Sequence, residues 1–76
     1  MTVEDRIREQ MEVVANDGGH VGTVDHLEGD GLIKLTRTDS ADGRHHFIPV
    51  DWVESVETAV RLSKPADEVR QQWKAA

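Results

Sequence analysis

Four histidines are the side chains in this sequence best suited to chemistry. Histidine is the commonest metal ligand and the side chain that titrates nearest to neutral pH. The histidines are His20, His26, His45 and His46, with Asp17, Asp25 and Asp42 close to them in the sequence. His20, His26 and His46 are the candidate metal ligands, which neighbouring carboxylates would complete.

The spacing of the histidines argues against a metal site. His45 and His46 are adjacent on an expected strand, so their side chains should point to opposite faces. We expect one of them to form a hydrogen bond at the rim of the fold and the other to face solvent. His20 and His26 lie six residues apart, on either side of an expected bend. We therefore expect neither a bound metal nor a cofactor.

A second hypothesis assigns the histidines to a pH-sensitive surface. The chain contains 9 Lys and Arg residues against 15 Asp and Glu residues, which gives a formal net charge of -6 at pH 7. Protonation of all 4 histidines would change that charge from -6 to -2. The change would occur near the ordinary histidine pKa of ~6.5.

Trp52, Trp73 and Val69 are candidates for packing or for contact with a partner. Trp52 follows the turn Pro49-Val50-Asp51, where a large side chain can fill the end of a small barrel. Trp73 shares one face of an expected helix with Val69, and tryptophan is enriched in interface hot spots. Two interpretations of Trp73 stay open: it packs on its own domain, or it contacts a partner. The predicted interaction residues are Trp73, Val69, Trp52, His45 and His46.

The sequence contains no recognisable catalytic centre. Because it lacks cysteine, disulfides, thiolate zinc sites and cysteine nucleophiles are excluded. None of Ser40, Ser55 and Ser63 stands in a G-x-S-x-G motif. Acidic pairs such as Glu28 and Asp30 belong to glycine-containing turns, and no phosphate-binding glycine motif occurs. We predict no catalytic residues and no enzyme activity.

Charge and hydropathy restrict the expected partners. Acidic residues outnumber basic ones, and the basic residues are dispersed, unlike the cationic groove of a barrel that binds single-stranded nucleic acid. The apolar runs are too short to span a membrane, and the acidic N-terminus does not resemble a signal peptide. We expect a cytoplasmic protein that binds neither nucleic acid nor membranes. Its expected partner is another protein or a second copy of itself.

Residue types and turn signals predict a mainly β fold. Val, Ile and Thr supply 18 of the 76 residues, and β-branched side chains favour strands. Turns that contain glycine or aspartate separate short apolar segments at the intervals of a meandering sheet or barrel. The expected strands are Met11–Asn16, His20–Glu28, Leu32–Arg37, Arg44–Pro49, Glu54–Glu57 and Val60–Leu62.

The second expected strand should bend. Val21, Val24 and Leu27 are spaced by three residues, whereas one face of a regular strand repeats every two. A bulge at Gly22-Thr23 would place these three side chains on one buried face. Small barrels need such bends in order to close.

Short helices are expected at both ends. Thr2 and Asp5 are spaced as in a capping box, which predicts a helix over Thr2–Gln10. Pro65 suits a first helical turn, which predicts a second helix over Pro65–Lys74.

Short motifs in a fixed order lie along the segment Met11–Leu62, which is about two thirds of the chain. They are Met11-Glu12-Val13, Asp17-Gly18, Val21-Gly22-Thr23-Val24-Asp25, Ile33-Lys34-Leu35, His45-His46-Phe47-Ile48-Pro49, Trp52-Val53, Val56 and Val60-Arg61-Leu62. In these motifs the chain resembles a family of small uncharacterised bacterial domains allied to the PRC-barrel domains. The resemblance implies a β-barrel of about six strands that acts as a docking module and not as a catalyst.

Together these observations predict one domain over residues 1–76, with the barrel over Met11–Leu62 between the two short helices. The predicted fold is mainly β: a small closed or nearly closed antiparallel β-barrel, PRC-barrel-like, with about six short strands. The predicted function is a non-catalytic protein-interaction module, with a homodimer as one possible form. The alternative is a small-ligand or metal-binding protein that uses the histidines near the Asp42–Pro49 hairpin.

Overall fold

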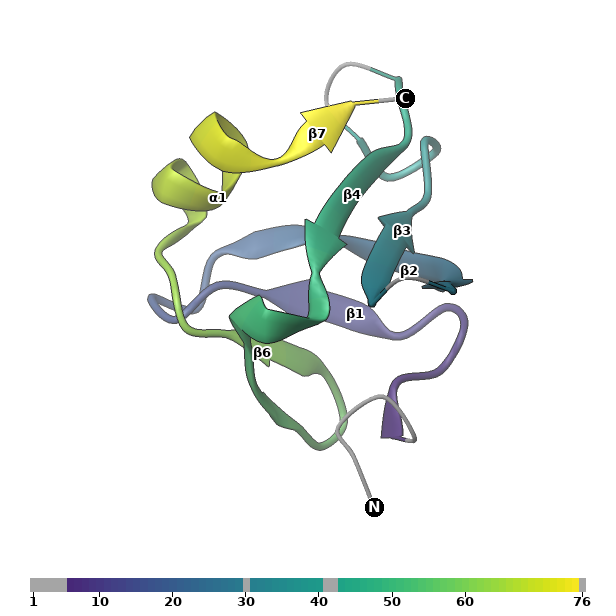
Figure 1. Cartoon of the computed structure of the whole chain (residues 1–76). Helices are drawn as coiled ribbons and strands as arrows, with labels where there is room; N and C mark the ends of the chain where they lie inside the picture. Colours follow the sequence, from purple (N-terminus) through teal and green to yellow (C-terminus); the bar gives the residue numbers. More distant parts are fainter. Residues whose placement is uncertain (1–5, 30, 41–42, 76) are drawn as a thin grey trace.

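Short strands make up most of the regular secondary structure in this computed structural model, which describes residues 6–29, 31–40 and 43–75. One sheet contains all seven strands in the order β5-β6-β1-β2-β3-β4-β7 (Figure 1). The strands are β1 (Glu12–Val14), β2 (His20–Glu28), β3 (Leu32–Leu35), β4 (His46–Pro49), β5 (Val53–Val56), β6 (Val60–Leu62) and β7 (Lys74–Ala75). A 3₁₀ turn, η2 (Val50–Trp52), precedes β5, and the helix α1 (Ala66–Gln72) precedes β7.

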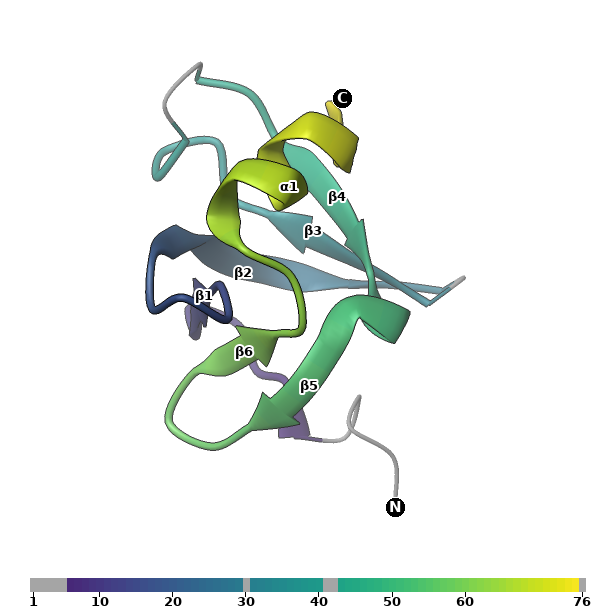
Figure 2. The same cartoon turned by 90° about the vertical axis from the view of Figure 1, so that its left-hand side faces the viewer.

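The long strand β2 joins the two halves of the sheet. Residues in its first half pair with β1, and residues in its second half pair with β3, both antiparallel. The strands β1 and β6 are parallel, with Val13 opposite Val60. This parallel pair places the β5–β6 hairpin beside β1, as Figure 2 shows, so the sheet is mixed and not purely antiparallel.

Buried side chains alternate with more exposed ones along the strands, and the buried ones form the core. In β3, Ile33 and Leu35 are buried, and in β6, Val60 and Leu62 are buried on either side of the exposed Arg61. A strand with one buried face shows this two-residue period. The largest fully buried side chains are Ile33, Leu35, Ile48, Leu62, Val13, Val24, Val60 and Val69.

Two irregularities bend β2, one on each side of Gly22-Thr23, where a single bulge was predicted. The register leaves Val21 unopposed between the pairs Gly22–Val13 and His20–Val14. It also leaves Asp25 unopposed between Val24 and His26, which face Leu35 and Lys34 of β3. An extra residue shifts the alternation of a strand by one position. Val21 and Val24 are therefore both buried, and Leu27 packs against the same core.

The expectation of a closed or nearly closed antiparallel barrel is wrong. Among the described residues no ladder joins the end strands β5 and β7, so the sheet stays open. After β6 the chain forms α1 and then pairs β7 with β4, at the opposite end of the sheet from β5. The mainly β architecture is confirmed. The bounds of β2 and β6 match the prediction, whereas β1, β3 and β4 are shorter than predicted.

The helices also differ from the prediction. Of the expected helix Thr2–Gln10, residues 2–5 lie outside the described residues, and residues 6–10 form no α-helix. Gln10 has a φ of 69°, which a right-handed helix does not contain. The C-terminal helix ends at Gln72, because Trp73 takes an extended conformation and Lys74 begins β7 beside β4. No helix in the described part of the chain is long and apolar enough to cross a membrane.

Candidate functional site

A pocket of about 220 Å³ lies where β2, the loop after β3, β4 and the C-terminal segment meet. We call it the Trp73 pocket; its lining residues are His20, Val21, Asp39, Ser40, His46, Arg70 and Trp73. In Figure 1 the yellow segment that carries α1 and β7 lies beside β4, the strand that begins with His46. The pocket therefore gathers three residues that the sequence marked as site candidates, namely His20, His46 and Trp73.

Trp73 forms one wall of the pocket by stacking on His46. The ring centroids are 3.8 Å apart and the planes differ by 13°. The extended conformation of Trp73 makes this contact possible, since it lets Lys74 pair with Phe47 one position beyond His46. Trp73 stays partly exposed, whereas His46 is only 2% exposed.

The buried His46 is bound to the loop after β3. Its Nδ1 atom lies 3.2 Å from Ser40 Oγ, a hydrogen bond that satisfies a polar ring inside the core. A hydroxyl beside an imidazole is also how serine nucleophiles are activated. Here Trp73 covers the imidazole, so a substrate has little access to it.

His20 links β1 to the loop after β3. Its Nδ1 atom lies 2.9 Å from Glu12 Oε2, and its Nε2 atom lies 2.6 Å from Asp39 Oδ2. The Thr23 hydroxyl donates a hydrogen bond of 2.6 Å to the same Asp39 oxygen. We call Glu12, His20 and Asp39 the His20 clip. It ties two chain segments together along one rim of the pocket.

The clip shifts the pKa values of two of its members. The hydrogen bond to Glu12 raises the pKa of His20 above its ordinary value, and Asp39 adds to this rise against the opposing effect of burial. The Thr23 hydroxyl and then His20 lower the pKa of Asp39. Both shifts favour the charged forms, so the clip is an ion pair at mildly acidic pH.

Arg70 differs from the clip residues, because it is a cation with no acidic partner among the described residues. Its Nη2 atom donates a hydrogen bond of 3.0 Å to the backbone oxygen of His20, and the described residues place no carboxylate against its guanidinium. Arg61 differs, because it donates a hydrogen bond to the backbone oxygen of Asn16 and also forms an ion pair with Glu54. The Arg61 Nε atom lies 3.3 Å from Glu54 Oε2.

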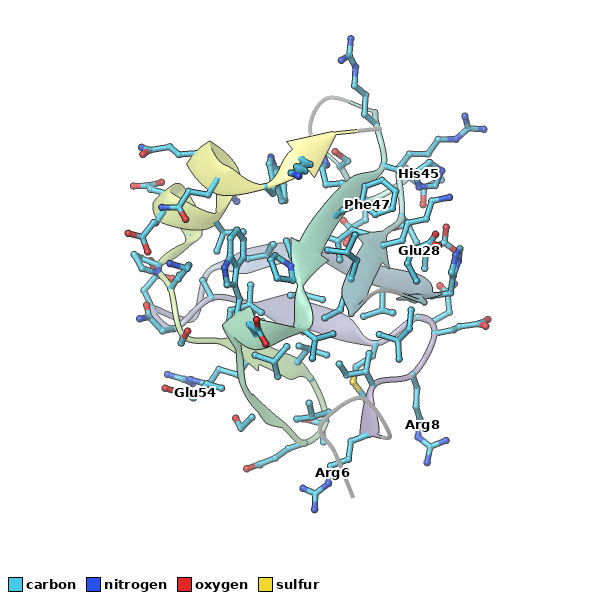
Figure 3. All side chains as sticks on the ribbon, viewed as in Figure 1. Arg6, Arg8, Glu28, His45, Phe47 and Glu54 are labelled. Carbon is cyan, nitrogen blue, oxygen red and sulfur yellow. The ribbon has the colours of Figure 1, made fainter. Side chains whose placement is uncertain are left out.

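His26 and His45 lie in a separate group outside the pocket. His26 Nε2 lies 2.9 Å from Glu28 Oε1, and its Nδ1 atom lies 3.6 Å from Asp25. His45 Nδ1 is 3.0 Å from the backbone oxygen of Leu35 and 3.8 Å from Asp25. Figure 3 shows His45 and Glu28 on the same side of the molecule. The adjacent histidines thus have different partners, and His46 is the buried one of the two.

The candidate metal ligands do not converge. Within the described ranges, no three His, Asp or Glu side chains are arranged to hold one metal ion. The two ring nitrogens of His20 face different carboxylates, and His26 lies apart from the pocket that His20 and His46 line.

Two of the predicted interaction residues belong to the core instead. Val69 lies in α1 and is completely buried, so it offers no surface to a partner in this structure. Trp52 is partly buried against the core on the β5 side, with Lys64 Nζ 5.4 Å from its ring centroid. It does not line the Trp73 pocket.

Sequence reasoning missed four lining residues: Val21, Asp39, Ser40 and Arg70. A signal existed for Arg70, since it stands three residues before Trp73, a spacing that places two side chains on one helix face. Asp39 and Ser40 gave no such signal, because their partners are 19 and 6 residues away in the sequence and belong to other strands.

Comparison with known proteins shows the family of this chain. A family model described as an uncharacterised protein conserved in bacteria, DUF2171, matches residues 7–70. This range includes every residue that lines the pocket except Trp73. No curated protein matches the chain.

Proposed function

Since this chain belongs to the bacterial family DUF2171, we propose that it is a non-catalytic protein-interaction module that docks its partner at the Trp73 pocket. The observation that carries the proposal is a partly exposed Trp73 beside an exposed Arg70 at a ready-formed pocket. Tryptophan and arginine are the residue types most enriched in interface hot spots, particularly around pockets that a partner can fill.

The size of the pocket favours a protein side chain as its occupant. At about 220 Å³ it is smaller than the sites of about 300–1,000 Å³ that usually hold small ligands and cofactors. The covered His46 supports a non-catalytic role, because the imidazole nearest to a hydroxyl lies beneath Trp73. The proposal places the protein in the cytoplasm, with neither nucleic acid nor a membrane as its partner.

The relation to PRC-barrel domains is also part of this proposal. The motifs between Met11 and Leu62 support it, as does the bent, mainly antiparallel sheet, although that sheet is open. What we take from the relation is the role of a docking module, because fold-level likeness alone carries no chemistry.

Site-specific photo-crosslinking in the bacterial host tests the proposed function. A photo-reactive residue replaces Thr38, which is exposed beside Asp39 of the pocket, and in a control it replaces Thr58, which is exposed in the β5–β6 turn. We expect protein adducts from position 38 and few from position 58. An adduct of twice the mass of the chain would identify a second copy as the partner. Equal adduct yields at the two positions, or none at either, would contradict the proposal.

A small-ligand protein is the alternative function, and the same pocket would be its site. Native mass spectrometry of the purified chain separates the two functions. A bound small molecule, together with no protein adduct from position 38, would support the alternative. A metal-binding form of this alternative would show a higher melting temperature with Zn²⁺ or Ni²⁺.

A further inference from the structure

We propose that the Trp73 pocket recognises a glutamate side chain on the protein partner and that Arg70 is the residue that binds its carboxylate. This inference rests on the proposed function and names the chemistry of the partner. Among the lining residues, Asp39 is acidic, whereas His20, His46 and Arg70 are basic.

The charges of the other lining groups are already satisfied. His20 has a carboxylate on each ring nitrogen, and Asp39 accepts hydrogen bonds from His20 and Thr23. The charges of His20 and Asp39 cancel when the imidazole is protonated. Arg70 is then the lining cation that lacks a carboxylate partner among the described residues, because Glu12 and Asp39 both face His20.

Arg70 has hydrogen-bond donors to spare. A guanidinium carries five N–H donors in a planar fork, and one Nη2 donor reaches the backbone oxygen of His20. No other hydrogen bond or ion pair of Arg70 joins it to the described residues. A carboxylate is the group that matches two parallel donors of this fork, and such charge-assisted pairs are among the strongest hydrogen bonds in proteins.

The rest of the pocket suits the methylene groups of the same side chain. Trp73 presents an aromatic wall and Val21 an aliphatic one, while Arg70 provides the cation. A glutamate side chain combines a short apolar stem with a terminal carboxylate, and it fits within about 220 Å³. Repulsion from acidic residues far from the pocket is screened beyond about 8 Å at physiological salt. The nearby carboxylates of Glu12 and Asp39 already face His20.

Peptide titration followed by two-dimensional NMR tests the inference. The probes are two capped pentapeptides with a central glutamate or glutamine between alanines. We expect the glutamate peptide to shift the signals of the Trp73 indole and of the Val21 amide, and to bind about tenfold more tightly than the glutamine peptide. The R70Q variant should bind both peptides equally. The matched control R61Q should keep the preference, because Arg61 already has Glu54 as its partner.

Each other outcome has a defined meaning. Equal binding of the two peptides at the pocket by the unmodified chain would overturn carboxylate recognition and leave the proposed function standing. No shift from either peptide would also overturn the inference. Shifts caused by free glutarate, but not by the glutamate peptide, would overturn the inference. They would indicate that the pocket binds a small carboxylate ligand and not a side chain of a protein partner. The proposed function itself fails only through the photo-crosslinking result. Since Arg70 is exposed, R70Q should keep the amide dispersion of the folded chain.

Discussion

His20 sits between carboxylates that come from two distant parts of the chain. Glu12 belongs to β1 and Asp39 to the loop after β3, so the ion pair restrains one rim of the pocket. Its energy is limited by exposure, because the side chains of His20, Glu12 and Asp39 are 46%, 54% and 41% exposed. Exposed ion pairs contribute at most about 1 kcal/mol, so the clip tunes a local geometry and does not hold the fold together.

The raised pKa of His20 predicts a pH-dependent contribution to stability. That contribution is fully present below the unfolded pKa of 6.5 and is lost as the pH rises through the higher folded pKa. The lowered pKa of Asp39 has the opposite sign: its contribution is present above 3.8 and is lost as the pH falls through the folded pKa. The clip should therefore stabilise the fold most between these two unfolded values.

We expect E12Q, which removes the largest cause of the raised His20 pKa, to be destabilising by up to about 1 kcal/mol at about pH 5.5, and by less at about pH 8.5. Urea unfolding followed by circular dichroism at both pH values measures the difference. The control is E54Q, because Glu54 is 54% exposed like Glu12 but pairs with an arginine that stays charged. Its effect should be the same at both pH values. An equal loss from E12Q at both pH values would refute the assignment.

At the scale of elements, the bent strand β2 decides how the two halves of the sheet meet. Gly22 lies between its two irregularities and is buried against Leu35 of β3. A Cβ atom at this position would lie 3.3 Å from Leu35 Cδ1, closer than ordinary van der Waals contact. The absence of a side chain at Gly22 therefore allows β2 and the buried Leu35 to approach each other.

This close approach predicts that G22A destabilises the fold by about 1 kcal/mol, because the buried Leu35 must move by a few tenths of an ångström. The control is G29A in the turn directly after the same strand, where an added Cβ atom would meet nothing within 4 Å. Its effect should stay within about 0.5 kcal/mol. Urea denaturation of both variants measures the two free energies of unfolding. Equal values for both would show that the contact with Leu35 does not matter.

On the scale of the whole molecule, one continuous core joins both ends of the open sheet. Trp52, beside β5, and Trp73, beside β7, both pack against the same cluster of buried residues. The parallel pairing of β1 with β6 ties the C-terminal hairpin to the N-terminal strand. A small domain with one such core usually unfolds in a single transition.

The two tryptophans allow this cooperativity to be measured from opposite ends. In W52F the fluorescence of Trp73 reports on the β7 side, and in W73F the fluorescence of Trp52 reports on the β5 side. We expect the fluorescence midpoint of each variant to coincide with its own midpoint from far-ultraviolet circular dichroism. A Trp73 transition at lower urea than the circular dichroism transition would show that the C-terminal segment unfolds separately.

Patterns of a few residues determined the strands. The alternation in β3, and the turn signals on either side of β2, were sufficient because turn chemistry and the two-residue period of a strand are local. The same kind of pattern predicted the helix around Val69, but not its end. Trp73 fits the helical stripe, yet it leaves the helix in order to stack on His46, a contact between residues 27 positions apart.

The sequence by itself thus determined that this protein is mainly β, that it has a short C-terminal helix, and that its candidate chemistry lies in histidines and tryptophans. Tertiary structure alone decided that the sheet stays open and that His20, Asp39, Arg70 and Trp73 surround one pocket. The physical reason is range. Periodicity and turn chemistry act over a few residues, whereas strand order and the charge of a pocket wall arise from pairings between distant segments that no local pattern specifies.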